Sequence, residues 1–322
     1  MSEAEDSALV DLLRFLKRGR YRFITPTPAT HARVVARKSE ARDVRDVLGW
    51  SLPFRADAID QDIFGLLERG GVLQRSEEKF VSRIRVSTYG DACFIHSAYP
   101  TLEADSVFFG PDSYRFANFI RRYLAASSGR VVDVGTGAGI GAMVAAGMTQ
   151  GSVIGTDINP LALRYARLNL HAANARASLH LGGGLEGVDG PIDVVIANPP
   201  YIADAAHRTY RDGGGLFGAE VALSWARDAA ARLPRGGRIL LYTGSAVVGG
   251  AHVLEEPLRE ALAGFEIGYH EIDPDVFGEE LERDGYVGVE RIAVVGVVAR
   301  RARRHQWRRT SVRARNSRRA PF

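Results

Sequence analysis

Residues 131–141 read Val-Val-Asp-Val-Gly-Thr-Gly-Ala-Gly-Ile-Gly, and residues 152–159 read Ser-Val-Ile-Gly-Thr-Asp-Ile-Asn. The first stretch is a β-branched run followed by a glycine at every second position, and an apolar helical pattern continues after it. This order predicts a strand, a tight turn and the N-terminus of a helix. Such a turn exposes backbone N–H groups at the positive end of a helix. Asp157 ends the second stretch's strand, where its carboxylate can accept two ribose hydroxyls, so we expect a ligand with an adenosine-like half.

Length and composition favour a two-domain protein of the reducing cytoplasm. At 322 residues the chain exceeds the usual size of one domain. It is 46% apolar, but no apolar run approaches the ~18 residues that a membrane helix needs, so we expect a soluble protein. The acidic start lacks the features of a secretory signal. Cys93 is the only cysteine and the eight histidines show no helical ligand pair, so we expect neither disulfides nor a metal site.

The net charge of +4 hides a strong asymmetry. Ten arginines lie between Arg300 and Arg319 with no acidic residue among them, and without them the rest of the chain has a net charge of −6. We expect residues 301–322 to form a basic, disordered tail suited to RNA, DNA or anionic surfaces. Trp307 adds a group that can stack on a base. A solvated tail without a specific role is the alternative reading.

The first third of the chain predicts a small helical module with a hairpin. Amphipathic or helical spacing occurs over residues 7–20, 31–45 and 59–67. Strand-like alternation follows over residues 72–81, 84–89 and 92–95. This order resembles a winged helix, which we place at residues 1–104 as a substrate-recognition domain. Such modules bind nucleic acid or a protein neighbour, and fold alone does not decide between them.

Strands and helices alternate through residues 105–300. We expect strands at 131–134, 152–156, 177–181, 192–197, 238–243, 265–271 and 292–299, with helices at 114–124, 160–173, 219–233 and 252–262. Asn159 is a good N-cap, and Pro160 suits the first helical position. The alternation predicts an α/β domain with a Rossmann-like, mostly parallel, seven-stranded sheet that is covered on both faces.

The tetrapeptide Asn198-Pro199-Pro200-Tyr201 directly follows a predicted buried strand. In open α/β sheets, ligands bind at the carboxyl ends of the strands. Two prolines make a rigid corner that directs backbone carbonyls and the Asn198 amide into the cleft. A side-chain oxygen and a main-chain carbonyl held in this way can accept both hydrogens of a planar NH₂ group, and Tyr201 can stack on the group that carries it.

Together these motifs resemble the class I S-adenosylmethionine-dependent methyltransferases, in the branch of release-factor glutamine methyltransferases and methyltransferase small domain proteins. The likeness covers about residues 105–300 and includes Asp-Ile-Asn-Pro-Leu-Ala-Leu at 157–163. It implies S-adenosyl-L-methionine as cofactor and Asn198, Pro199, Pro200 and Tyr201 as the catalytic motif. It implies a cofactor site formed by Asp133, Gly135, Thr136, Gly137, Gly139, Asp157, Ile158 and Asn198.

The chain departs from that branch in two places. Gly183 stands where an acidic residue is expected near the adenine, and Glu186 comes slightly later. Phe109-Gly-Pro-Asp-Ser-Tyr differs from the Pro-Arg-Pro-Glu-Thr type of loop. These differences do not affect the assignment to the methyltransferase class, but they leave the identity of the methyl acceptor undecided.

Three functions therefore remain as hypotheses. The first is methylation of a glutamine side chain in a protein, for example a translation factor. The second is methylation of adenine N6 or guanine N2 in RNA or DNA. The third is a cofactor-binding, RNA-associated protein with little turnover. A nicotinamide oxidoreductase is disfavoured, because it has no need of Asn-Pro-Pro-Tyr.

Overall fold

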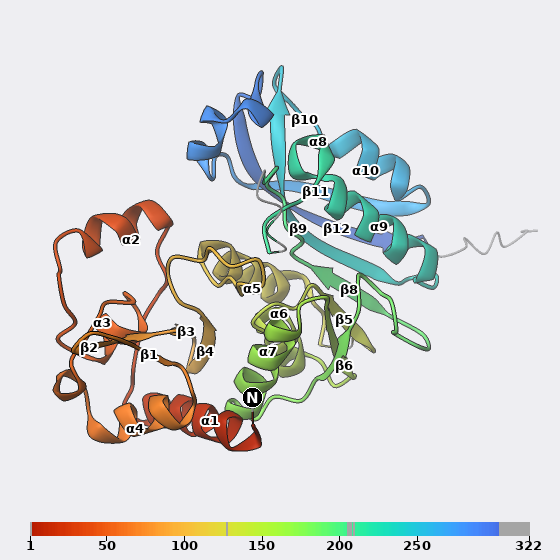
Figure 1. Ribbon diagram of the computed structural model, residues 1–322. Helices are drawn as coiled ribbons and strands as arrows, with labels where there is room; N and C mark the ends of the chain where they lie inside the picture. The colour runs from red at the N-terminus through yellow and green to blue at the C-terminus, as the bar shows by residue number, and fades with distance from the viewer. Residues whose placement is uncertain (1, 127, 205–207, 209, 303–322) are drawn as a thin grey trace, which may run out of the picture.

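The computed structural model describes residues 2–126, 128–204, 208 and 210–302 (Figure 1). Helix α1 (Glu3–Arg18) begins with a capping box, in which the Ser2 hydroxyl accepts a hydrogen bond from the Glu5 amide and the Glu5 carboxylate accepts one from the Ser2 amide. The next elements are α2 (Pro28–Val35), α3 (Val44–Leu48), the 3-10 helix η1 (Ala56–Ala58), α4 (Gln61–Arg69), β1 (Leu73–Ser76), β2 (Lys79–Ser82), β3 (Ile84–Tyr89) and β4 (Ala92–Ser97).

Two expectations for this part were wrong in detail. The single strand expected over residues 72–81 is the β1–β2 hairpin, because the chain reverses at Glu77, which has φ +55°. The helix expected over residues 31–45 is divided into α2 and α3. Between them, the Asp46 carboxylate accepts hydrogen bonds from Lys38 Nζ and from the Arg42 amide, which holds an irregular connection. The likeness to a winged helix and the domain boundary near residue 104 stay predictions.

The sheet that follows confirms the predicted α/β class. Its main strands are β5 (Val131–Val134), β6 (Val153–Asp157), β7 (Ser178–Leu181), β8 (Val194–Ala197), β9 (Arg238–Val248), β11 (Phe265–Asp273) and β12 (Arg291–Arg301). They lie in the order β11-β12-β9-β8-β5-β6-β7, and β10 (Ala251–His252) pairs with the end of β9. The pairs among β5 to β9 are parallel, whereas β12 is antiparallel to both β9 and β11. The strand order reverses between β5 and β8, which is where such sheets bind ligands.

Helices cover both faces of this sheet (Figure 1). They are α5 (Pro111–Tyr123), α6 (Ile140–Met148), α7 (Pro160–Ala172), α8 (Gly215–Gly218), α9 (Glu220–Arg232) and α10 (Glu255–Ala261), with the 3-10 helices η2 (Gly278–Glu282) and η3 (Asp284–Tyr286). Side chains alternate along β5, so that Val131 packs on the side of α5, α6 and α7 while Val132 packs on the side of α9 and α10. The parallel strands are therefore buried on both faces, as their apolar runs predict.

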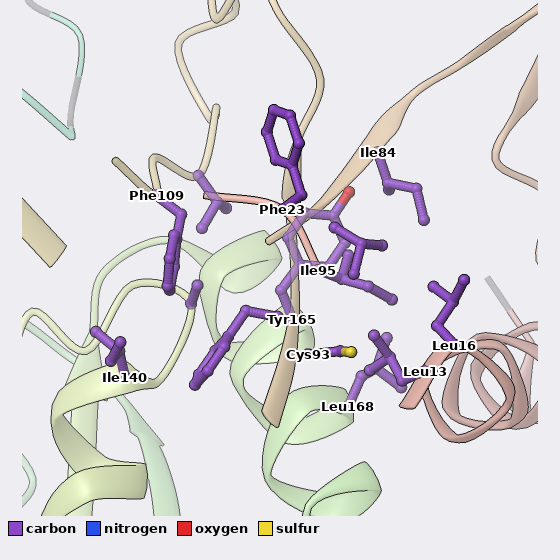
Figure 2. Packing of buried hydrophobic residues seen from close by; sticks show 14 of the residues in the cluster. Leu13, Leu16, Phe23, Ile84, Cys93, Ile95, Phe109, Ile140, Tyr165 and Leu168 are labelled. Atoms are coloured by element: carbon purple, nitrogen blue, oxygen red, sulfur yellow. The ribbon is translucent and has the colours of Figure 1, made fainter. Parts of the chain in front are cut away.

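One buried apolar cluster joins the N-terminal elements to the sheet domain (Figure 2). Leu13 and Leu16 of α1 and Cys93 of β4 belong to the same cluster as Tyr165 and Leu168 of α7. The buried Asn169 side chain reinforces this contact, because it hydrogen-bonds both the amide and the carbonyl of Ile95 and the carbonyl of Ala138. The N-terminal elements are therefore fixed against the helices that flank the glycine turn. None of the helices in the described ranges is long and apolar enough to cross a membrane.

Candidate active site

The turn after β5 borders a cleft of about 460 Å³. Gly135, Gly137 and Gly139 have φ values of +67°, +55° and +86°, a region of backbone conformation that favours glycine. A Cβ atom on Gly135 would lie 2.6 Å from the Trp225 ring. Gly135, Thr136 and Gly137 line the cleft, as predicted for a site that presents backbone to a ligand.

Asp157 lies at the end of β6 and is tied to the turn. Its Oδ2 accepts a hydrogen bond of 2.9 Å from the Gly137 amide, and its Oδ1 accepts one of 2.9 Å from the Asn159 amide. Burial raises the pKa of Asp157, and these backbone donors oppose that shift. Asn159 caps α7 through the Leu161 amide, as expected. Ile158 is 58% exposed and lines the cleft together with Asp157, which places an apolar surface beside a carboxylate.

Asp133 and Gly139 lie beneath the turn and are not among the residues that line the cleft. Asp133 is buried, and its Oδ2 accepts hydrogen bonds from the Thr136 hydroxyl at 2.6 Å and the Ala142 amide at 2.7 Å. Burial raises its pKa to about 7. A Cβ atom on Gly139 would lie 3.0 Å from Ala166 of α7. The structure therefore gives both residues contacts that support the turn from below.

Asn198 follows β8 and lies between two cavities. It lines the cleft described above and also a second cavity of about 110 Å³, which we call the acceptor pocket. Its Oδ1 is buried and, in the part of the chain that the structure describes, has no hydrogen-bond partner. A buried polar atom without a partner costs about 1–3 kcal/mol, so the site gains when a donor is supplied. Pro200 lines both cavities, whereas Pro199 lines the acceptor pocket.

The Tyr201 ring packs tightly behind the motif. It is buried, and a Cβ atom on Gly244 of β9 would lie 2.1 Å from its Cδ2. Burial, followed by the charge of the nearby Asp112, raises the pKa of Tyr201 well above its usual range. The ring also lines the acceptor pocket, with Phe277 at a centroid distance of 6.0 Å. Tyr201 thus forms a wall of the pocket, and its stacking on a substrate stays a prediction.

Several residues of the acceptor pocket were not expected from the sequence. They come from separated parts of the chain: Pro28, Thr101, Phe108, Asp112, Tyr210, Arg211 and Phe277. Phe108 and Tyr210 also line the cofactor cleft, and their rings stack with a centroid distance of 6.0 Å and an interplanar angle of 13°. Phe108 and Asp112 belong to the loop and helix start that precede the glycine turn. From the sequence, this loop lies near the glycine turn and either closes over a ligand or forms a plain connection between domains, and the structure places Phe108 in the lining of both cavities.

Asp112 is a buried carboxylate in this pocket. Its Oδ1 accepts a hydrogen bond of 2.9 Å from the Tyr242 hydroxyl and one of 3.5 Å from Arg115. Arg115 also pairs with Asp273 at 2.6 Å. Burial raises the pKa of Asp112, and these donors oppose the shift. The group connects α5, β9 and β11 directly behind Tyr201.

Ion pairs hold the segment after the motif in place. Asp204 pairs with Arg208 at 2.6 Å, and Arg211 pairs with Glu280 at 2.6 Å. The Arg208 guanidinium hydrogen-bonds the Asp204 carboxyl and lowers its pKa to about 2. Asp212 forms a bridge with Ile202 and lines the cofactor cleft. His207, considered as a loop residue from the sequence, lies outside the described residues.

Two further stretches, around Gly183 and around Phe217, lie at the edges of the site. Gly183 lines the cofactor cleft where an acid was expected, and its amide donates a hydrogen bond of 3.4 Å to Glu186, which is exposed. Phe217, in the small apolar patch after the motif, stacks on Tyr286 at 6.4 Å. Neither Leu216 nor Phe217 is among the residues that line the two cavities. Among residues 2–126, 128–204, 208 and 210–302, no cluster of three or more potential metal ligands occurs.

Comparison with known proteins agrees with this architecture. Residues 116–261 match the family Methyltransferase small domain. The chain is similar to the release factor glutamine methyltransferase of Deinococcus radiodurans, with 34% identity over 47% of this chain and 55% of that protein. It is also similar to the enzyme of that name from Rhodospirillum rubrum, with 29% identity over 63% of this chain and 61% of that protein. The chain therefore carries a class I S-adenosylmethionine-dependent methyltransferase domain.

The chain covers only part of the length of these relatives. The chain spans a little over half of the length of the two release factor relatives. A solved structure, Trm5b from Pyrococcus abyssi, matches with a TM-score of 0.50 at 16% identity, over 77% of this chain and 69% of that one. This likeness concerns the fold alone.

The cleft fits S-adenosylmethionine, the cofactor of this family. The carboxylate of Asp157 can accept a pair of ribose hydroxyls, Ile158 and Trp225 offer apolar surface for a planar base, and Gly135 and Gly137 present backbone that no side chain shields. A Cβ atom at Gly135 or Gly137 would require a strained backbone at the position where the ligand must approach. The described residues thus supply each kind of contact that the cofactor needs, without the acidic residue expected near Gly183.

Proposed function

We propose that this protein is an S-adenosylmethionine-dependent N-methyltransferase that acts on a planar amide or amine nitrogen, with a glutamine side chain of a protein as the first candidate. The observation that carries the proposal is the buried, unpartnered Oδ1 of Asn198, which lies between the cofactor cleft and the acceptor pocket in the described part of the chain. The names of the relatives from Deinococcus radiodurans and Rhodospirillum rubrum support glutamine.

The motif's residues have a defined task in this reaction. The cofactor supplies an activated methyl group when bound. Asn198 Oδ1 and the Pro199 carbonyl accept the two hydrogens of the target nitrogen, which orients its lone pair toward the cofactor cleft. These acceptors also stabilise the positive charge that grows on nitrogen. Alignment of this kind can supply about 7–11 kcal/mol, and no strong base is needed if the proton leaves after transfer.

A nucleobase amine is the second candidate, and one observation favours it. The stacked pair Phe108 and Tyr210 lies where the two cavities meet, and with Pro200 it lines a flat, apolar passage. Such a passage accepts the ring that carries adenine N6 or guanine N2. For the N-terminal module and for residues 301–322, contact with nucleic acid is one of the readings that the sequence leaves open, and that reading goes with this candidate.

Transfer of a labelled methyl group tests both candidates. The purified chain is incubated with methyl-tritiated S-adenosylmethionine and a cell lysate, and the product is digested with protease or with nuclease. We expect label that protease releases and nuclease does not. Label that only nuclease releases would replace glutamine with a nucleobase. Absence of label together with cofactor binding by calorimetry would support the third hypothesis, a binding protein with little turnover.

A further inference from the structure

An extended segment leads from the end of α1 to the acceptor pocket. Over residues 20–25 its side chains alternate: Tyr21, Phe23 and Thr25 are buried, while Arg20, Arg22 and Ile24 are exposed. The segment runs along β3, because the Thr88 amide donates a hydrogen bond of 2.8 Å to the Phe23 carbonyl. Because Tyr21, Phe23 and Thr25 are buried against the protein, the side chains of Arg20, Arg22 and Ile24 are held toward solvent.

Helix α5 runs beside this segment and ends in exposed arginines. Near the pocket, the Thr25 amide donates a hydrogen bond of 3.0 Å to the Tyr114 hydroxyl, and Pro28 lines the pocket itself. One turn further along α5, Asn118 accepts a hydrogen bond of 2.9 Å from Tyr89 of the β3–β4 hairpin.

The tip of this hairpin holds the extended segment. Arg22 pairs with Asp91 there at 2.7 Å. Arg121 and Arg122 follow one turn beyond Asn118 and are exposed. Since a helix rises 1.5 Å per residue, they lie about 15 Å from Asp112 in the pocket.

The charge of this face is strongly one-sided. Residues 12–39 contain eight basic and no acidic residues. Lys17 and Arg22 both lie near Cys93, where their charges oppose the rise of the thiol pKa to about 11 that burial causes. Four exposed residues of this set and two exposed arginines at the end of α5 form what we call the α1–α5 basic surface: Lys17, Arg18, Arg20, Arg22, Arg121 and Arg122. Asp91 pairs with Arg22 and cancels one positive charge, and the other five basic residues keep the surface positive.

We propose that the α1–α5 basic surface binds the phosphate backbone of single-stranded RNA, so that the adjoining part of the strand reaches the acceptor pocket. Arginines along a rigid strand and helix match a repeating phosphate better than the irregular charges of an acidic protein. Ile24, which is 64% exposed, and the partly exposed Tyr89 add apolar surface on which bases can stack. RNA binding by this surface is argued from its geometry and charge alone. The link to the acceptor pocket rests on the proposed function, and it applies whether the methyl acceptor is a base of the RNA or a protein bound to the RNA.

Salt-dependent RNA binding tests this proposal on the full chain without any methyl donor, so the result does not depend on methyl transfer. The test variant is Arg121→Ala/Arg122→Ala. The matched control is Arg227→Ala/Arg235→Ala, which removes two exposed arginines, one in α9 and one in the turn after it. Helix α9 packs on the other face of the sheet. The affinity for a short, unstructured, fluorescent RNA is measured as salt is raised.

We expect the test variant to reduce the slope of log affinity against log salt by about 1.4, because each single-strand phosphate contact contributes about 0.7. The control should leave the slope unchanged. Equal slopes for both variants would overturn the proposal, since binding would then reside elsewhere, for example in residues 303–322. Binding of polyglutamate, but not RNA, with the same sensitivity to Arg121 and Arg122 would also overturn it. Unfolding curves of both variants confirm that α5 is intact.

Discussion

The cofactor cleft and the acceptor pocket meet at Asn198, but they are built in different ways. About half of the residues that line the cleft lie in or just after β5, β6 and β7, and the others come from residues 106–116 and 198–225. The acceptor pocket is lined by side chains from distant positions, among them Pro28, Phe108 and Phe277. Local turns thus form one half of the cofactor cleft, whereas the acceptor pocket depends on long-range packing around residues 198–202.

The largest effect that separates the two regions is expected for Gly135→Ala. Left-handed backbone costs an alanine roughly 1–2 kcal/mol, and contact with Trp225 adds about 1–3 kcal/mol of overpacking. Calorimetry should show cofactor affinity reduced at least tenfold, together with a lower free energy of unfolding. Gly147→Ala is the matched control, because this helical glycine has no neighbour within 4 Å of the added Cβ and should be neutral or slightly stabilising. A Gly135→Ala protein that binds the cofactor normally would contradict the backbone-built cleft.

Gly244→Ala should act on the acceptor pocket instead. The added Cβ would lie 2.1 Å from the Tyr201 ring, so the ring must move, at a cost of about 1–3 kcal/mol. We expect lower methyl transfer with cofactor affinity retained. In the background of Tyr201→Ala the same change should cost much less, as expected for two residues in contact. Parallel loss of cofactor affinity would show that the two regions are not separable.

Much of the cofactor cleft could be predicted because its determinants are local. The β-branched run before Gly135, the glycine spacing and the Asn159 cap each specify their own backbone. Gly135, Gly137 and Asp157 line the cleft, and their contacts with the cofactor stay predictions. The acceptor pocket was predicted only at Asn198 to Tyr201. Pro28 and Phe277 reach it through tertiary packing that no local pattern encodes.

Sequence patterns also failed where alternation is ambiguous. Residues 72–81 alternate equally well as one strand or as a hairpin, and the turn at Glu77 carries no glycine to mark it. The sequence likewise could not show that the Asp133 side chain points toward α6 and accepts a hydrogen bond from the Ala142 amide, since both faces of β5 are buried. The direction of a side chain at a doubly buried strand depends on the finished sheet.

A further prediction concerns the pH dependence of stability. Burial raises the folded-state pKa of Asp133 to about 7, above its usual value near 3.8. Because the folded state then binds more protons, the Asp133 contribution to stability is present at low pH and is lost as pH rises from about 4 to about 7. Relative to Asp133→Asn, the wild type should lose up to about 1.4 kcal/mol per pH unit in this window. Denaturant unfolding at several pH values measures this difference, and parallel profiles would contradict the assigned burial.

The most direct test of the central claim is the comparison of turnover and cofactor affinity in Asn198→Ala. Asn198 lies at the boundary of the cleft and the pocket, so the account predicts that methyl transfer into the labelled lysate fraction falls about 100-fold or more. The dissociation constant for S-adenosylmethionine, measured by calorimetry, should change little. Asn118→Ala, an exposed asparagine on α5, serves as the control and should leave both quantities unchanged. Unchanged methyl transfer in Asn198→Ala would contradict the account.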